Sequence, residues 1–103
     1  MLYIENMNQS KFSKAFSDSN RLKIITFLSE GPQNVSSVAN KLSVEENLAS
    51  HHLRVLAALG FLKNNKKGRE VYYKLNDAKF ITLLKDLKKN PAFKEILVKA
   101  LED

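Results

Sequence analysis

The sequence predicts a mainly α-helical fold with one small β-hairpin, in the order ααααββαα. Over most of the 103 residues, apolar side chains recur at the three- and four-residue intervals typical of helices that bury one face. One stretch, from Phe61 to Leu75, instead combines strand-forming residues with a central glycine. The chain has no internal repeat and no linker rich in proline or glycine, and its length is that of one domain. We therefore expect residues 1–103 to form a single domain.

The N-terminal half carries three helical patterns. A short helix is expected over about 8–16, with Phe12, Ala15 and Phe16 on one face. A second helix over 20–29 is expected to bury three residues at three-residue steps, Leu22, Ile25 and Leu28, before Gly31-Pro32 stops it. Asn34 is the expected N-cap of a third helix, whose apolar residues are Val35, Val38, Ala39 and Leu42.

The C-terminal half carries three more helices and the hairpin. Ser43 and Glu46 have the spacing of a capping box, which predicts the start of a fourth helix that Gly60 ends. Strands are expected over 61–65 and 69–75, with Gly68 in the turn. Asn76-Asp77 should cap a fifth helix, with Asp77 as the N-cap residue, and its apolar stripe is Phe80, Leu83, Leu84 and Leu87. Asn90-Pro91 should open a sixth, because proline is favoured at the first helical position.

The charge is concentrated in the hairpin. The formal net charge is +6 and the isoelectric point is about 9.6. Five basic residues and one acid lie between Phe61 and Leu75, which is five minus one, or +4 of the +6; they are Lys63, Lys66, Lys67, Arg69, Lys74 and Glu70. This distribution favours an anionic partner, with nucleic acid first, although a solvated basic hairpin would have the same composition.

Two short helices joined by a tight turn and followed by a basic hairpin predict a winged helix-turn-helix. We expect 34–42 to support a recognition helix over 45–59, which enters the major groove of double-stranded DNA, while a wing over 62–75 contacts phosphates. The expected DNA-binding residues are Ser36, Asn47, Ser50, His51, Arg54, Lys66, Lys67 and Arg69. His51 could also be merely exposed, and His52 is expected to pack inside. Glu45 and Glu46 suit either the helix dipole or a hydrogen bond from cytosine.

The sequence resembles the ArsR/SmtB transcriptional repressors from about Phe16 to Asp77. The resemblance rests on the segment Ser50-His51-His52-Leu53-x-x-Leu56 followed by Gly60, and on the wing pattern Gly68-Arg69-x-x-x-Tyr73. It implies a homodimer built through the first and fifth helices, which represses an operator until an effector binds.

The sensor positions of that family differ in this chain. Where some members carry a Cys-x-Cys pair, this chain has Asn34 and Ser36. Where others bind zinc through Asp-x-His and His-x-x-Glu, it has Asp77, Lys79, Asn90 and Phe93. Asn34 and Ser36 are poor ligands for soft metals, and one carboxylate beside a lysine cannot hold Zn²⁺, which takes about four N, O or S ligands. We therefore expect no metal and no cofactor.

The terminal helices, over about 8–16 and 77–102, are expected to form the dimer. The predicted interface residues are Phe12, Phe16, Phe80, Leu83, Leu84 and Leu87. A two-fold dimer should bind an imperfect palindrome. No catalytic constellation, signal peptide or membrane span is visible and cysteine is absent, so we expect a cytoplasmic regulator that is no enzyme. A winged-helix protein-interaction module and a sensor gated by a small ligand remain alternatives.

Overall fold

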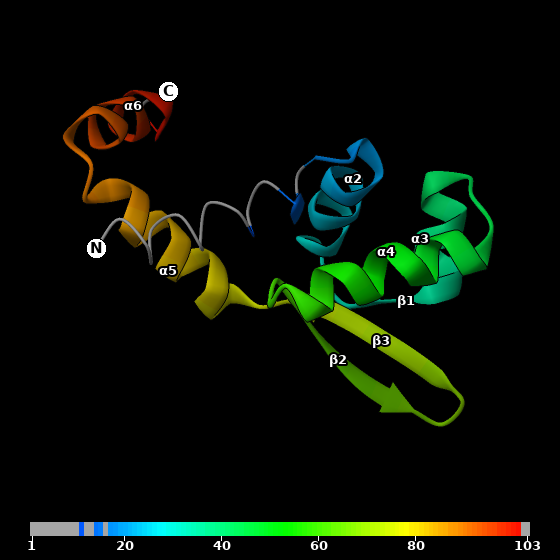
Figure 1. The fold of residues 1–103 in the computed structure, drawn as a ribbon. Coiled ribbons are helices and arrows are strands. Elements are labelled where there is room, and N and C mark those ends of the chain that lie inside the picture. Colours follow the sequence, from blue (N-terminus) through cyan, green and yellow to red (C-terminus); the bar gives the residue numbers. More distant parts are fainter. Residues whose placement is uncertain (1–10, 12–13, 16, 102–103) are drawn as a thin grey trace.

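The computed structural model describes residues 11, 14–15 and 17–101 (Figure 1). Its helices are α2 (Ser19–Leu28), α3 (Val35–Leu42), α4 (Glu46–Ala58), α5 (Asp77–Lys88) and α6 (Pro91–Leu101), and its strands are β1 (Gln33–Asn34), β2 (Leu62–Lys67) and β3 (Glu70–Leu75). The mainly helical prediction is confirmed. Of the expected first helix, residues 11, 14 and 15 are described and helical, whereas Phe12 and Phe16 lie outside the described residues. Within the described part of the chain, no helix has the length and apolar character needed to cross a bilayer.

The elements form a body from which two parts extend (Figure 1). Helices α2, α3 and α4 make the body, and a turn of three residues, 43–45, joins α3 to α4. The hairpin of β2 and β3 projects from the body as a wing, while α5 and α6 lead away on another side. A short helix pair followed by a projecting hairpin is the winged helix-turn-helix arrangement.

The core lies where α2, α3, α4 and the base of the wing meet. Its largest fully buried side chains are Phe61, Ile24, Leu53, Leu56 and Val38. Phe61 lies between α4 and β2, and its ring packs on Phe80 of α5 with centroids 5.2 Å apart. Burying such side chains stabilises the fold by about 1.5–3 kcal/mol each. The wing and α5 are therefore anchored to the body through Phe61.

The sheet has three strands, where the sequence predicted two. The order is β1-β3-β2, and both pairs are antiparallel. The additional strand pairs Gln33 with Tyr73 and Asn34 with Tyr72. Two residues are too few to display the period of a strand, so the pairing has no sequence signal. It ties the residues that precede α3 to the wing.

The turn between α3 and α4 differs from the predicted capping box. Ser43 is the C-cap of α3 and is left-handed, with φ of 56°, and the N–H of Val44 donates to the Ala39 carbonyl at 3.0 Å. Glu45 takes the N-cap position of α4 and makes no side-chain capping bond. A left-handed residue is the usual way to end a helix. The prediction that Ser43 starts α4 is wrong, because Ser43 ends α3.

Two further details of the helices correct the sequence prediction. Leu22 is 49% exposed, because the buried face of α2 follows Ile24, Ile25 and Leu28 and leaves Leu22 at its edge. Asp77 is the first residue of α5 and not its N-cap, a position held by Asn76, which makes no side-chain capping bond. By contrast, Asn34 caps α3 as predicted, since its Oδ1 accepts from Ser37 N–H at 2.8 Å.

Candidate nucleic-acid interface

The outward face of α4 is polar and exposed. At about 100° per residue, Asn47, His51, Arg54 and Ala58 lie opposite the buried residues of this helix, and all four are exposed. The buried residues are Ala49, His52, Leu53 and Leu56. Among the residues that the structure describes, the side chains of Asn47 and Arg54 make no hydrogen bond or ion pair. Three of the predicted contact residues, Asn47, His51 and Arg54, thus share one exposed surface of the recognition helix.

The other predicted contacts of the helix-turn-helix lie beside this face. Ser50 is half-buried at its edge. Ser36 is exposed in the first turn of α3, next to Ser37, whose hydroxyl donates to Gln33 Oε1 at 2.7 Å. Glu46 is exposed in the first turn of α4, where a carboxylate suits the helix dipole. These residues widen the polar surface around the N-terminal half of α4.

The inner side of α4 is held by an arginine that the sequence did not single out for this role. Arg21 Nε donates to His52 Nδ1 at 3.4 Å, and its Nη1 donates to the Lys14 carbonyl at 2.7 Å. Arg21 thus links residues before α2 to the recognition helix. His52 is only 5% exposed, so the prediction that it packs inside is confirmed. No sequence spacing could have paired residues 31 positions apart in two different helices.

The surroundings of this contact lower the pKa values of His52 and Asp18. Burial is the main cause that lowers the pKa of His52 below its usual value; the nearby Asp18 carboxylate acts in the opposite direction, and Arg21 adds to the lowering. Asp18 Oδ1 accepts from Asn20 N–H at 2.7 Å and thereby caps α2. This hydrogen bond is the main reason that the pKa of Asp18 lies below its usual value. The geometry therefore favours a neutral His52 beside a charged Asp18.

The wing presents cations on an antiparallel ladder. The predicted residues Lys66, Lys67 and Arg69 are all exposed, on both sides of the tip. The register also sets Lys63 directly opposite Lys74, and both are exposed. Like charges facing each other across a strand pair destabilise a hairpin. An anion that lies along the wing would relieve the repulsion between Lys63 and Lys74. The sequence counted these two lysines in the hairpin charge but did not place them together.

The single acid of the wing is engaged within it. Tyr72 Oη donates to Glu70 Oε2 at 3.1 Å, and Lys67 Nζ lies 5.4 Å from the centroid of the Tyr72 ring. Gly68, the first of two turn residues, has φ of +63°, which a glycine adopts without strain. At the base, Asn76 Nδ2 donates to the Gly60 carbonyl at 2.8 Å. The wing is thus ordered from its tip to its base, with its cations outside.

The residues predicted for the dimer interface fall into three groups. Leu84 is 49% exposed on α5, whereas Leu83 is buried and Phe80 and Leu87 pack against the core of the same chain. Phe12 and Phe16 lie outside the described residues. Ile81, which the sequence analysis did not select, is 51% exposed one turn before Leu84. The free apolar surface of α5 therefore consists of Ile81 and Leu84.

The family sensor positions hold side chains with other contacts. Asn34 Oδ1 caps α3, and Asn90 Oδ1 accepts from the N–H groups of Ala92 and Phe93 at the start of α6. Lys79 Nζ lies 5.8 Å from the centroid of the Phe61 ring. Across the described ranges, no three histidine, aspartate or glutamate side chains gather as a group that could hold a metal ion.

Comparisons with known proteins agree with this geometry. The family described as "Bacterial regulatory protein, arsR family" matches residues 18–64. A CadC homolog of Staphylococcus aureus, described as a cadmium resistance transcriptional regulatory protein, is 47% identical over 72 residues, which are 69% of this chain and 60% of that protein. The transcriptional repressor SdpR of Bacillus subtilis is 33% identical over 63 residues, 61% of this chain and 70% of that one.

A solved structure extends the likeness beyond the matched sequence. An ArsR-like transcriptional regulator from Rhodococcus sp. RHA1 superposes with a TM-score of 0.74 at 28% identity, over 92% of this chain and 90% of that one. The sequence match to the CadC homolog, by contrast, spans 60% of that protein's length. The fold is thus shared over most of the chain.

Proposed function

Because this chain belongs to the arsR family of bacterial regulatory proteins, we propose that it is a homodimeric transcriptional repressor that binds double-stranded DNA in a sequence-specific way. The observation that carries this proposal is the pairing of a free polar face on α4 with an exposed basic wing. Both are fixed to one core through Phe61 and the contact between Arg21 and His52. A helix held at its inner side and free at its outer side is what major-groove recognition requires.

In this proposal α4 supplies the base contacts. Asn47 can donate to and accept from an adenine, and Arg54 can donate to a guanine or to a phosphate. His51 and Ser50 lie beside them, and Ser36 of α3 is proposed to contact the DNA backbone. Glu46 has two alternative roles: it either stabilises the helix dipole or accepts a hydrogen bond from cytosine. Specificity would thus depend on side chains from a single helix.

The wing supplies contacts that do not depend on base sequence. Lys66, Lys67 and Arg69 near the tip, and the facing pair Lys63 and Lys74, can each neutralise a phosphate. Contacts of this kind position a protein on the duplex and make its affinity depend on salt.

The exposed apolar residues of α5 support a dimer. Ile81 and Leu84 leave about half of each side chain in water in the single chain, and a two-fold contact between two copies of α5 would cover both. Such a dimer would set two recognition helices about 34 Å apart, one turn of the duplex. The operator would then be an imperfect palindrome.

We further propose that metals do not release this repressor. The name of the CadC homolog refers to cadmium resistance. In this chain, however, Asn34 and Ser36 offer no thiolate, and Asn34 and Asn90 already use their side chains to cap helices. Soft metals select thiolates, so retention of a cadmium response would need a different ligand set.

A salt titration tests DNA binding against the rival function of a protein-interaction module. A fluorescent mixed-sequence duplex is titrated with the protein at several salt concentrations, and the logarithm of the affinity is plotted against that of the salt. We expect a straight line of negative slope, whose magnitude is about 0.9 for every phosphate contacted. Absence of binding at low salt would contradict the proposal.

A further inference from the structure

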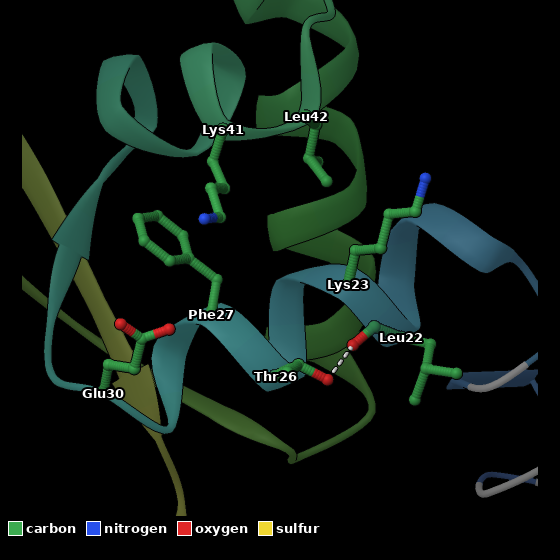
Figure 2. Close-up of a pocket in the computed structure, with 7 residues that line it drawn as sticks. All are labelled: Leu22, Lys23, Thr26, Phe27, Glu30, Lys41 and Leu42. Carbon is green, nitrogen blue, oxygen red and sulfur yellow. Dashed lines mark hydrogen bonds between the residues drawn. The ribbon is translucent and has the colours of Figure 1, made fainter.

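A pocket between α2 and the end of α3 is not used by the proposed DNA contacts. Its volume is about 390 Å³, and it is lined by Leu22, Lys23, Thr26, Phe27, Glu30, Lys41 and Leu42 (Figure 2). Ligand pockets in proteins usually measure about 300–1,000 Å³. The opening is therefore large enough for a small organic molecule.

The lining combines apolar surface with lysines that form no salt bridge within the described residues. Phe27 and Leu42 are half-buried and Leu22 is 49% exposed, so three large apolar side chains border the pocket. Figure 2 shows Lys41 extending from α3 towards the ring of Phe27 on α2, and its Nζ lies 5.4 Å from the ring centroid. Lys23 lies on the other side of the opening, below Leu42. An apolar molecule against Phe27 would thus meet the ammonium group of Lys41, whereas the ammonium group of Lys23 points away from Phe27.

The charge balance selects the sign of the ligand. Two lysines and one glutamate, Lys23, Lys41 and Glu30, leave one net positive charge around the pocket. Among the described residues, none of these three takes part in a salt bridge, since those observed are Lys89–Asp86 and Lys99–Glu95. Thr26 Oγ1 donates to the Leu22 carbonyl at 3.0 Å, so its proton is already used. The unmatched charge is therefore a positive one.

We propose that this pocket binds an amphipathic monocarboxylate, with the apolar body of the ligand against Phe27, Leu22 and Leu42, its carboxylate at Lys41, and Lys23 as the second positive charge of the lining. An uncharged analogue would gain the apolar contacts but not the ionic ones, and a dianion would lack a matching second charge. This site is separate from the recognition helix and the wing. The proposal does not depend on DNA binding.

An NMR titration without DNA tests the proposal. The ¹⁵N-labelled chain is titrated with octanoate and 3-phenylpropanoate, and separately with the corresponding alcohols. We expect the amide signals of Thr26, Phe27, Lys41 and Leu42 to shift saturably, with the acids bound more tightly than the alcohols. Exposed ammonium groups contribute modestly, so Lys23→Gln and Lys41→Gln should each weaken the acids by up to about fivefold and leave the alcohols unchanged.

The control is Lys94→Gln, which removes an exposed lysine of α6 and should not alter the affinity. The proposal is overturned if neither acid shifts these signals at millimolar concentration. It is also overturned if acids and alcohols bind equally, or if the double variant Lys23→Gln/Lys41→Gln binds the acids as the unmodified chain does. Because no DNA is present, these results are independent of the repressor function.

Discussion

Arg21 Nε donates a hydrogen bond to Nδ1 of His52 at 3.4 Å, across 31 positions of sequence. The contact joins the beginning of α2 to the inner side of the recognition helix. It requires His52 to be neutral with its proton on Nε2, because a protonated ring would turn Nδ1 into a donor facing another donor. The orientation of α4 is therefore connected to the protonation of a buried side chain.

The free energy of unfolding should decrease as the pH is lowered, because of His52. Burial lowers the pKa of His52 in the folded chain, so below the ordinary value of about 6.5 the unfolded chain binds the proton more readily. The contribution of His52 to stability is thus fully present above that value and decreases as the pH falls below it. The decrease ends once the pH is below the pKa of His52 in the folded chain. Urea unfolding between pH 8 and pH 5 measures the effect.

The matched variants are His52→Gln and His51→Gln. The first should remove the pH dependence in this range, whatever it does to absolute stability, and the second, on the exposed face, should retain it. The pKa of Asp18 is also lowered, but its contribution is lost only as the pH falls below about 3.9, outside this range. Equal pH profiles for His52→Gln and the unmodified chain would refute the prediction.

Replacing the cations at the tip of the wing should weaken binding to all DNA sequences alike. Lys66→Ala/Lys67→Ala/Arg69→Ala removes three exposed charges, and the magnitude of the salt slope should decrease by up to about 0.9 for each lost phosphate contact. Lys89→Ala/Lys94→Ala/Lys99→Ala removes as many charges from the end of α5 and from α6, and should alter the slope little. If both triple variants had the slope of the unmodified chain, the wing would not contact phosphates.

Acidic residues on the free face of α5 should dissociate the dimer. Ile81→Glu/Leu84→Glu places two carboxylates where the dimer would bury apolar surface, and sedimentation should then show monomers with no operator binding. Leu87 is less suitable for this test because it packs against the core of its own chain. Thr82→Glu, exposed on the same helix, is the control and should remain dimeric. A dimeric double variant, or tight DNA binding by a monomer, would disprove the architecture.

Zinc, cadmium and arsenite at micromolar concentration should not release the DNA. The prediction follows from the side chains at the family sensor positions, Asn34, Ser36, Lys79, Asn90 and Phe93, which lack thiolates and imidazoles. Fluorescence anisotropy of a labelled operator, with and without each ion, measures whether DNA is released, with EDTA as the reference. Tight stoichiometric zinc binding by calorimetry together with loss of operator affinity would contradict it.

The sequence predicted most of the fold because local signals agreed with one another. The cap at Asn34, the start of α6 at Pro91 and the glycine of the wing turn each lie where the structure has them. The exposure of Asn47, His51 and Arg54 followed from the helical period alone. These features depend on neighbours within a few residues, which a single sequence displays.

Features that depend on distant contacts were missed. Ser43 had the spacing of a capping box but ends α3, since one residue between two helices can serve either. Leu22 fits a three-residue repeat, yet the face that α3 and α4 cover is centred on Ile24 and Leu28. The strand β1, the facing pair Lys63 and Lys74, and the contact between Arg21 and His52 all arise from tertiary packing. Local patterns contain no information about them.

Selection of bound fragments from the host genome tests the central claim most directly. Sheared DNA is incubated with the protein at physiological salt, and the retained fragments are sequenced. We predict one enriched motif, an imperfect palindrome with half-site centres about 10 base pairs apart, and loss of its enrichment with Asn47→Ala/Arg54→Ala. Fragments without a common motif, or a motif that this double variant enriches equally well, would contradict sequence-specific recognition by α4.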